Sequence, residues 1–359
     1  MKVGLVRDGA AMHGVASALD ARCFAGIDLV SVDLPKALLL SPWERCAGKD
    51  SAAYLDALAL GSTDFASCDL FHLASPRTLY WKPPGQYVYE CDMAFSHYIQ
   101  AYAPWADEIR ELRAEQAAEL RAIESTVVCD ERCLGVITWS EWARAYICDE
   151  FGVDQARVRV IRPSVQQKQR RVAHGKRRHL LFVGRWHQRK GGDVCIAAFR
   201  QVLVDEPDAV LTYVGGLDMT STVEDLIDSG KLRWVPAVQD RFAVGRLMNE
   251  ADVFILPTRM ESFGMVLLEA LAWNLPIVTT DGPWLEDLVR NGLDGFVVAS
   301  DDAEAVAHRA TILLHSDSEY VRILEMQRNN EHLRVDYALT RYPAGKCRRQ
   351  LCEAQAPSL

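Results

Sequence analysis

Two glutamates lie on either side of the expected start of a helix in the second half of the sequence. Glu261 precedes Gly264, and Glu269 follows it in an apolar, helix-forming segment over residues 265–271. Eight residues are slightly more than two helical turns, so the two carboxylates return to roughly the same side. Carboxylates accept hydrogen bonds from sugar hydroxyls, and the free N–H groups of a helix N-terminus bind anions. This spacing suits a ligand that carries both hydroxyls and phosphates.

A second candidate anion site lies upstream. Residues 180–183 form an apolar strand that runs into Gly184, and a basic loop with Arg185 and Lys190 leads to a helix that starts near Asp193. The guanidinium of Arg185 offers a planar fork to phosphate oxygens, and Lys190 offers a mobile point charge. Without this loop, the two glutamates are more simply interpreted as one helix cap and one solvated group. With it, a phosphate-bearing ligand becomes the better interpretation.

These segments resemble the retaining glycosyltransferases of family four, which have the GT-B fold. The resemblance rests on Gly184-Arg185, Lys190-Gly191, Glu261, Phe263-Gly264 and Glu269, and it is strong over residues 180–298 and weak before residue 136. It implies two Rossmann-like α/β domains, each a doubly wound parallel sheet, that face a central cleft. It also implies that a sugar is transferred from a nucleotide diphosphate donor to an acceptor with retention of anomeric configuration.

The resemblance implies a role for each of these residues. Arg185 and Lys190 are expected to hold the diphosphate and to stabilise the charge that grows as the glycosidic bond breaks. Glu261 is expected to contact hydroxyls of the transferred sugar, and Glu269 the ribose. Val238 is expected to contact the base. The remaining donor contacts are expected from a loop near the N-terminus and from backbone amides of the two segments: Gly14, Gly184, Phe263, Gly264 and Met265.

The acceptor side is expected in the first half of the chain. Glu90-Cys91-Asp92 ends a strand, and ligands bind at this edge of a doubly wound sheet. Many members of the resembled family carry a histidine near the reacting sugar here, and Cys91 stands in its place. Asp92 is therefore the candidate that positions the acceptor, while capping of the following segment explains it equally well. A glycan, a lipid-linked sugar and a small molecule all stay open as acceptors.

Neither a metal nor a cofactor is expected. The sequence has no Asp-x-Asp motif, so fixed cations would replace a divalent ion at the phosphates, and the nucleotide sugar is a substrate. Asp193 and Asp281 are the nearest acidic candidates, and each has an ordinary role as helix cap or turn residue. The ten cysteines are scattered without a Cys-x-x-Cys pair, which predicts reduced thiols in a cytosol.

The length of 359 residues predicts two domains. Residues 1–165 are expected to form the acceptor-side domain, residues 166–179 a linker, and residues 180–336 the donor-nucleotide domain. The resemblance implies that residues 337–359 complete the first domain. Strands are expected at residues 3–6, 27–32, 70–73, 87–90 and 157–161, with a strand and turn over 136–140, and then at 180–183, 210–214, 233–235, 253–256, 277–279 and 296–298. Intervening helices, among them 106–123, 141–151, 194–203 and 265–273, indicate parallel sheets.

Charge and hydropathy restrict the partners and the location. A net charge of −9 argues against nucleic acid. No apolar run is long enough to span a membrane, and the N-terminus lacks the regions of a signal peptide, so a cytoplasmic location is expected. Six basic residues in the linker allow a second interpretation, peripheral contact with the inner membrane surface, but no amphipathic helix accompanies them. Oligomeric state is left open.

Three other functions stay open from the residues alone. A sugar-nucleotide epimerase shares the GT-B architecture, although the two glutamates and two cations resemble transferases more closely. A non-catalytic nucleotide-sugar-binding subunit would explain the weak resemblance of the first half. A dehydrogenase is the least favoured, because the Gly-x-Gly-x-x-Gly fingerprint is absent.

Overall fold

The structure is a computed structural model, and it describes residues 2–7, 28–33, 68–73, 83–105, 114–163, 168, 176–185, 187–236, 241–285 and 288–330. The predictions for Gly14, Val238, residues 337–359 and most of residues 166–179 lie outside this part of the chain. The chain divides into two compact units. The described residues up to Pro163 belong to the first unit, and those from Lys168 onward belong to the second.

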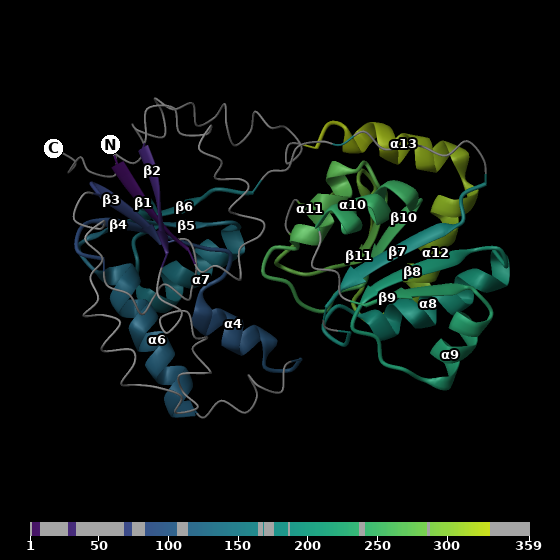
Figure 1. The fold of residues 1–359 in the computed structure, drawn as a ribbon, viewed down its shortest axis with the longest axis horizontal. Coiled ribbons are helices and arrows are strands. Elements are labelled where there is room, and N and C mark those ends of the chain that lie inside the picture. The colour runs from purple at the N-terminus through teal and green to yellow at the C-terminus, as the bar shows by residue number, and fades with distance from the viewer. Residues whose placement is uncertain are drawn as a thin grey trace. The chain divides into compact units, whose positions relative to one another are not determined.

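The first unit is built on a six-stranded parallel sheet in the order β2-β1-β3-β4-β5-β6 (Figure 1). The strands are β1 (Lys2–Arg7), β2 (Asp28–Asp33), β3 (Leu70–Leu73), β4 (Tyr87–Cys91), β5 (Cys133–Thr138) and β6 (Val158–Val160). The described helices are α4 (Phe95–Tyr102), α6 (Ala114–Cys129) and α7 (Glu141–Phe151), with a 3-10 turn, η5 (Gln155–Arg157). The Tyr87 hydroxyl donates to the Val127 carbonyl of α6 at 2.8 Å, so the face of β4 that carries Tyr87 packs against α6.

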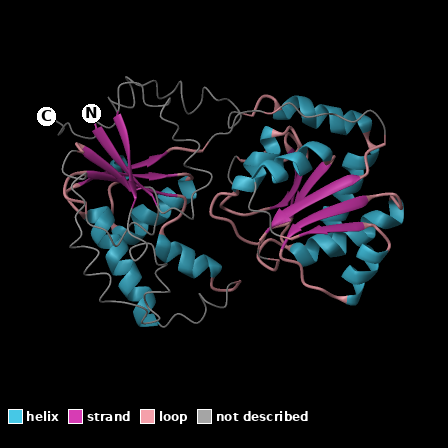
Figure 2. Ribbon diagram, in the orientation of Figure 1, coloured by secondary structure: helices cyan, strands magenta, loops and turns pink. Residues whose placement is uncertain are grey.

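The second unit is built on a six-stranded parallel sheet in the order β12-β11-β10-β7-β8-β9, with helices on both faces (Figure 2). The strands are β7 (His179–Gly184), β8 (Val210–Gly215), β9 (Leu232–Val235), β10 (Val253–Leu256), β11 (Ile277–Thr280) and β12 (Gly295–Val298). The described helices are α8 (Gly192–Asp205), α9 (Ser221–Asp228), α10 (Arg241–Glu250), α11 (Met265–Ala272), α12 (Ala303–His315) and α13 (Asp317–Gln327). All four residues of β10 are buried, as expected for a strand covered on both faces.

In each sheet, successive strands are added first on one side of the initial strand and then on the other, so the strand order reverses once. In the first sheet β2 lies on one side of β1 and β3 lies on the other; in the second sheet β8 and β9 lie on one side of β7 and β10 lies on the other. The second order is that of the dinucleotide-binding fold. Ligands of open α/β sheets bind outside the carboxyl ends of the strands at such a reversal. Ligand sites are therefore expected at the carboxyl ends of β7 and β10 in the second unit, and of β1 and β3 in the first.

The predicted strands are confirmed, but the prediction of one helix was wrong at its end. A helix was expected to stop at residue 123, and α6 continues to Cys129. The amphipathic pattern breaks at Glu124, a polar residue that is fully buried. Its carboxylate accepts hydrogen bonds from the backbone N–H groups of Phe95 (2.6 Å) and Ser96 (2.9 Å) at the start of α4. Burial raises the pKa of this carboxyl, although the two N–H groups act in the opposite direction. The side chain is buried because it caps another helix, a role that the local pattern does not reveal.

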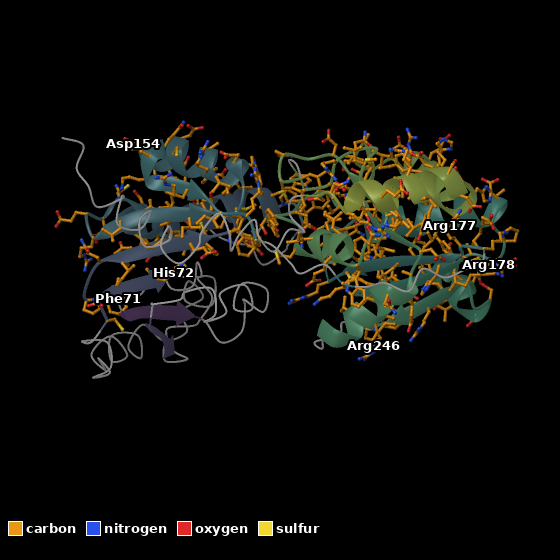
Figure 3. All side chains as sticks on the ribbon, turned by 90° about the horizontal axis from the view of Figure 1, so that it is seen from above. Phe71, His72, Asp154, Arg177, Arg178 and Arg246 are labelled. Carbon is orange, nitrogen blue, oxygen red and sulfur yellow. The ribbon has the colours of Figure 1, made fainter. Side chains whose placement is uncertain are left out.

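Part of the basic segment that lies between β6 and β7 in the sequence forms ion pairs with acidic residues of the second unit. Lys176 Nζ lies 2.6 Å from Glu206, Arg177 lies 2.8 Å from Asp317, and Arg178 lies 3.6 Å from Asp208. Arg177 and Arg178 are labelled in Figure 3. These three charges are at least partly neutralised, which weakens the interpretation of the run as a membrane-binding segment. Among the described residues, no helix combines the length and the hydropathy needed to cross a membrane.

Candidate functional site

The basic loop between β7 and α8 folds as a tight turn. The backbone N–H of Gly192 donates to the His187 carbonyl at 2.7 Å, and Gly191 has a φ of +67°, which favours glycine. Gly184 packs against the aliphatic part of Lys190, since a Cβ there would lie 2.9 Å from its Cβ and Cγ. The turn thereby returns Lys190 to the carboxyl end of β7, and α8 begins at Gly192, one residue before the expected Asp193.

Lys190 and Glu261, the two charged groups that the sequence assigned to different parts of the ligand, form an ion pair. Lys190 Nζ donates to Glu261 Oε1, and the side chains are 12% and 6% exposed. Glu261 follows β10, the neighbour of β7 at the reversal of the sheet. Burial lowers the pKa of Lys190 to about 8, although Glu261 acts in the opposite direction. Burial alone would raise the pKa of Glu261, but Lys190 and Arg189 lower it below its usual value.

The contacts of the Glu261 carboxylate with the described residues all involve one oxygen. Oε1 also accepts a hydrogen bond from the Thr258 hydroxyl at 3.0 Å and lies 3.5 Å from Arg189 NH1. Within the part of the chain that the structure describes, no partner is recorded for Oε2. The carboxylate is therefore oriented by its Oε1 contacts, while Oε2 can accept a hydrogen bond from a ligand hydroxyl.

Arg259 ties the end of β10 to the first turn of α8. Its guanidinium makes two 2.7 Å hydrogen bonds to the carboxylate of Asp193 and a third, of 2.6 Å, to Asp301. Its backbone N–H donates to the Arg189 carbonyl at 2.9 Å. The paired, parallel bonds of an arginine to a carboxylate hold both position and angle. Asp193 therefore anchors the loop through Arg259. It is not the helix cap, because Gly191 occupies the N-cap position of α8.

A second tie connects the loop to the end of β8. His187 Nδ1 lies 2.7 Å from the Tyr213 hydroxyl, and Gln188 Nε2 donates to Asp218 at 3.1 Å. Burial lowers the pKa of His187, which favours the neutral imidazole. The basic loop is thus held at both ends, by β8 and by β10.

The N-terminus of α11 lies on the same segment as Glu261. Gly264 precedes the helix with a φ of +88°, and no side chain caps it. Phe263 is buried, and Met265 begins the helix as expected. Glu269 lies in the middle of α11 and is partly exposed, whereas Arg185 is exposed immediately after β7. The structure thus brings Lys190 and Glu261 into contact, and leaves Arg185 with no ion pair among the described residues.

On the first unit, Asp92 follows β4 directly. Its Oδ1 accepts a hydrogen bond from the backbone N–H of Met93 at 3.0 Å. It does not cap α4, because Ala94 is at the cap position and Glu124 accepts the bonds of the first helical N–H groups. Cys91 is buried, and the pKa of its thiol is raised by burial. The capping interpretation of Asp92 was wrong, and its role toward an acceptor stays a prediction.

Several residues of this arrangement were not identified from the sequence. The loop and the glutamate are held by Arg189, Thr258, Arg259 and His187, and one of these, Arg189, is adjacent to a motif residue, Lys190. The sequence did contain a signal for the two arginines. Arg189 lies next to a glycine-rich turn and Arg259 follows a buried strand, and an arginine is costly to bury unless a carboxylate pairs with it. No group of three or more potential metal ligands occurs among the described residues.

Comparison with known proteins decides the family. The sequence profile described as "Glycosyl transferases group 1" matches residues 165–330. A glycogen synthase of Mycobacterium tuberculosis is 30% identical over 292 residues, with 74% of this chain and 68% of the relative covered. The chain belongs to the group 1 glycosyltransferases. A phosphatidyl-myo-inositol mannosyltransferase of Mycolicibacterium smegmatis is 34% identical over 143 residues, with 39% of this chain and 37% of the relative covered.

Solved structures of low sequence identity share the fold. A sucrose-phosphate synthase from Thermosynechococcus elongatus has a TM-score of 0.69 at 18% identity, with 99% of this chain and 100% of that chain covered. Anabaena HepE, solved with UDP and glucose, has a TM-score of 0.66 at 13% identity, with 99% of each chain covered. The predicted fold class, GT-B, is confirmed. This group 1 glycosyltransferase is an enzyme that transfers a sugar from a nucleotide sugar, and the epimerase and binding-subunit alternatives are not favoured.

Proposed function

We propose that this glycosyltransferase transfers a hexose from a nucleoside diphosphate sugar with retention of configuration and without a metal ion. The observation that carries the proposal is the buried Lys190–Glu261 pair at the reversal point of the second sheet. A cation for the diphosphate and a carboxylate for the sugar are adjacent there, and the diphosphate and the sugar are directly bonded in the donor. The support from relatives is that HepE was solved with UDP and glucose.

In this proposal Lys190 and the exposed Arg185 bind the diphosphate oxygens. The bond between the anomeric carbon and the diphosphate oxygen breaks, and the leaving diphosphate keeps the electron pair. The acceptor oxygen forms its new bond to the same face of the anomeric carbon, and the acceptor proton passes to the leaving phosphate oxygen. The two cations act mainly on the charge that develops in this step, so they stabilise the transition state more than the bound donor.

The remaining donor contacts follow the same arrangement. Glu261 Oε2 accepts a hydrogen bond from a hydroxyl of the transferred sugar, and Glu269 accepts hydrogen bonds from the ribose. Phe263, Gly264 and Met265 offer backbone N–H groups to anionic oxygens at a helix start where Gly264 supplies no side-chain cap. Gly14, Gly184 and Val238 supply further donor contacts, and Asp92 is the proposed acceptor contact. No cofactor takes part.

A screen of nucleotides tests the proposal directly. UDP, GDP and ADP are each added to the full chain, and the melting temperature is recorded, because a ligand that binds only the folded state raises it. One of them is expected to raise the melting temperature, and the corresponding diphosphate sugar is then supplied with candidate acceptors. No stabilisation by any of the three would contradict the assignment of the donor site.

The two glutamates are expected to affect different steps. Glu269→Ala should weaken nucleoside diphosphate binding by about tenfold or more, since a hydrogen bond to a charged group contributes about 1.5–3 kcal/mol. Glu261→Gln should weaken nucleotide binding less than Glu269→Ala does, through the charge of Lys190 that Glu261 favours, and should mainly lower transfer, because its proposed partner is the sugar. Calorimetry with the nucleotide and a transfer assay measure both. Equal effects of both variants on nucleotide binding would reject this division.

The pKa of Lys190 predicts how nucleotide affinity depends on pH. Below pH 8 the ammonium is charged and binds the diphosphate; above pH 8 the free protein loses this charge, so affinity should fall by up to about tenfold per pH unit. The diphosphate itself has finished ionising in this range. Lys190→Arg keeps the charge at all these pH values and should remove the dependence. The dissociation constant is measured from pH 7 to pH 10; an identical slope in both proteins would assign it to another group.

Metal independence is a further expected result. Fixed cations neutralise the leaving diphosphate in this proposal, so turnover should persist after exhaustive treatment with EDTA and should not rise with added Mn²⁺. Turnover is measured with and without the chelator at constant ionic strength. Loss of activity with EDTA and recovery with Mn²⁺ would show that Arg185 and Lys190 do not suffice.

A further inference from the structure

Three polar side chains of the first unit share one face of its sheet at the carboxyl ends of neighbouring strands. In the register of the sheet, His72 of β3 pairs with Val88 of β4, and Glu90 of β4 pairs with Ile137 of β5. Residues two apart on a strand lie on the same face. His72, Glu90 and Trp139, which follows β5, therefore form a diagonal row across the three strands. This face is opposite to the one on which Tyr87 meets α6.

The three side chains contact one another. Glu90 Oε1 accepts a hydrogen bond from Trp139 Nε1 at 2.9 Å, and Glu90 Oε2 lies 2.8 Å from His72 Nε2. The latter contact is close in distance but departs from an ideal hydrogen-bond angle. Glu90 is buried, and burial alone would raise the pKa of its carboxyl, but His72 and Trp139 lower it. Glu90 is therefore an anion that contacts the imidazole of His72 at Nε2 and orients the ring.

The other ring nitrogen of His72, Nδ1, makes no hydrogen bond or ion pair with the described residues. Nε2 is buried, and the side chain as a whole is 14% exposed. A carboxylate at Nε2 favours the tautomer with the proton on Nε2, so the neutral ring carries its lone pair on Nδ1. An imidazole that is oriented at Nε2 and carries a lone pair on Nδ1 is a hydrogen-bond acceptor of fixed direction.

The position of His72 in the fold also indicates a ligand. β3 is one of the two strands at which the first sheet reverses, and His72 is the residue before its last, Leu73 (Figure 3 labels His72). Open α/β sheets bind ligands outside the carboxyl ends of such strands. At the next strand, Asp92 Oδ1 already accepts the N–H of Met93, and the N-terminus of α4 is closed by Glu124.

We propose that His72, oriented by Glu90, accepts a hydrogen bond through Nδ1 from a hydroxyl of the sugar acceptor. This rests on the proposed function only in calling the ligand an acceptor; binding of a hydroxyl compound at Nδ1 is independent of the donor site. The ligand class is a polyhydroxylated compound, and no covalent step involves the ring.

The first test is NMR of the full chain labelled with ¹⁵N-histidine, with D-glucose as the probe and glycerol for comparison. The His72 signals are assigned by their loss in His72→Gln. We expect the neutral ring to carry its proton on Nε2, and the Nδ1 signal to shift with D-glucose in a saturable way. A ring protonated on Nδ1, or an Nδ1 signal that D-glucose does not move, would overturn the proposal even if a nucleotide binds the second unit.

The second test uses two variants that each retain one half of the imidazole. His72→Gln can place its amide near Nε2 and so keep the Glu90 contact, whereas His72→Asn can place its amide near Nδ1 and keep an outward hydrogen-bond acceptor. If His72 binds the acceptor, His72→Gln should raise KM for the acceptor about tenfold with KM for the donor unchanged; tenfold corresponds to about 1.4 kcal/mol, within the range of one hydrogen bond. His72→Asn should restore part of that loss.

A purely structural role gives the opposite pattern. His72→Gln would then behave like the wild type, because Glu90 keeps its partner, and His72→Asn would be the defective variant. Melting temperatures of both variants show whether a defect arises from folding. A wild-type KM for the acceptor in a folded His72→Gln enzyme would overturn the proposal.

Discussion

Lys190→Ala and Arg185→Ala are both expected to lower turnover by about 10² or more, but only Lys190→Ala should destabilise the protein. Each variant removes a cation that stabilises the leaving diphosphate, and a factor of 10² corresponds to about 2.7 kcal/mol. Arg185 is exposed, so its loss should leave stability within about 0.5 kcal/mol. Lys190 is the buried partner of Glu261, and removing one member of such a pair costs about 3–5 kcal/mol.

A double variant separates the two effects. Lys190→Met with Glu261→Gln removes both buried charges, so it should recover most of the stability lost in Lys190→Ala while turnover stays low. Arg189, 3.5 Å from Glu261, limits the loss in the single variant. Urea unfolding and steady-state turnover are measured on all four proteins. Wild-type turnover in a folded Arg185→Ala or Lys190→Ala enzyme would refute the assignment of the diphosphate site.

Gly191→Ala is expected to be the most damaging single-methyl change in the basic loop. A Cβ at this position would lie 1.9 Å from the Pro257 carbonyl oxygen, which belongs to the backbone and cannot rotate away as a side chain could. The loop must therefore move away from the end of β10, and it carries Lys190 with it. We expect a loss of about 3 kcal/mol or more in stability and a fall in turnover similar to that of Lys190→Ala.

Gly230→Ala is the matched control for this change. Gly230 has a φ of +71°, close to the +67° of Gly191, but nothing lies within 4 Å of its added Cβ. It should cost only the penalty of a left-handed residue, about 1–2 kcal/mol, with unchanged turnover. Comparison of the two urea midpoints then isolates the collision with Pro257. Equal stability of the two variants would mean that the loop does not pack against β10 as the structure shows.

Much of the donor segment could be predicted from the sequence because its signals are local. The apolar run of β10, the helix beginning after Gly264, and the cations after Gly184 each depend on a few consecutive residues. Strand and helix periodicities are properties of such short stretches. The alternation of strands and helices likewise determined that both sheets are parallel. The residue types alone indicated a ligand with both hydroxyls and phosphates.

The tertiary structure decided which of these groups meet. Lys190 and Glu261 are 71 positions apart in the sequence, and they pair because β7 and β10 are neighbours at the reversal of the sheet. The buried Glu124, which caps α4 from α6, and the braced His72 also depend on contacts between distant segments. A buried charge is stable only where another element supplies its partner. The residue sequence determined which charges the chain carries, and the order of the strands determined which of them could be buried together.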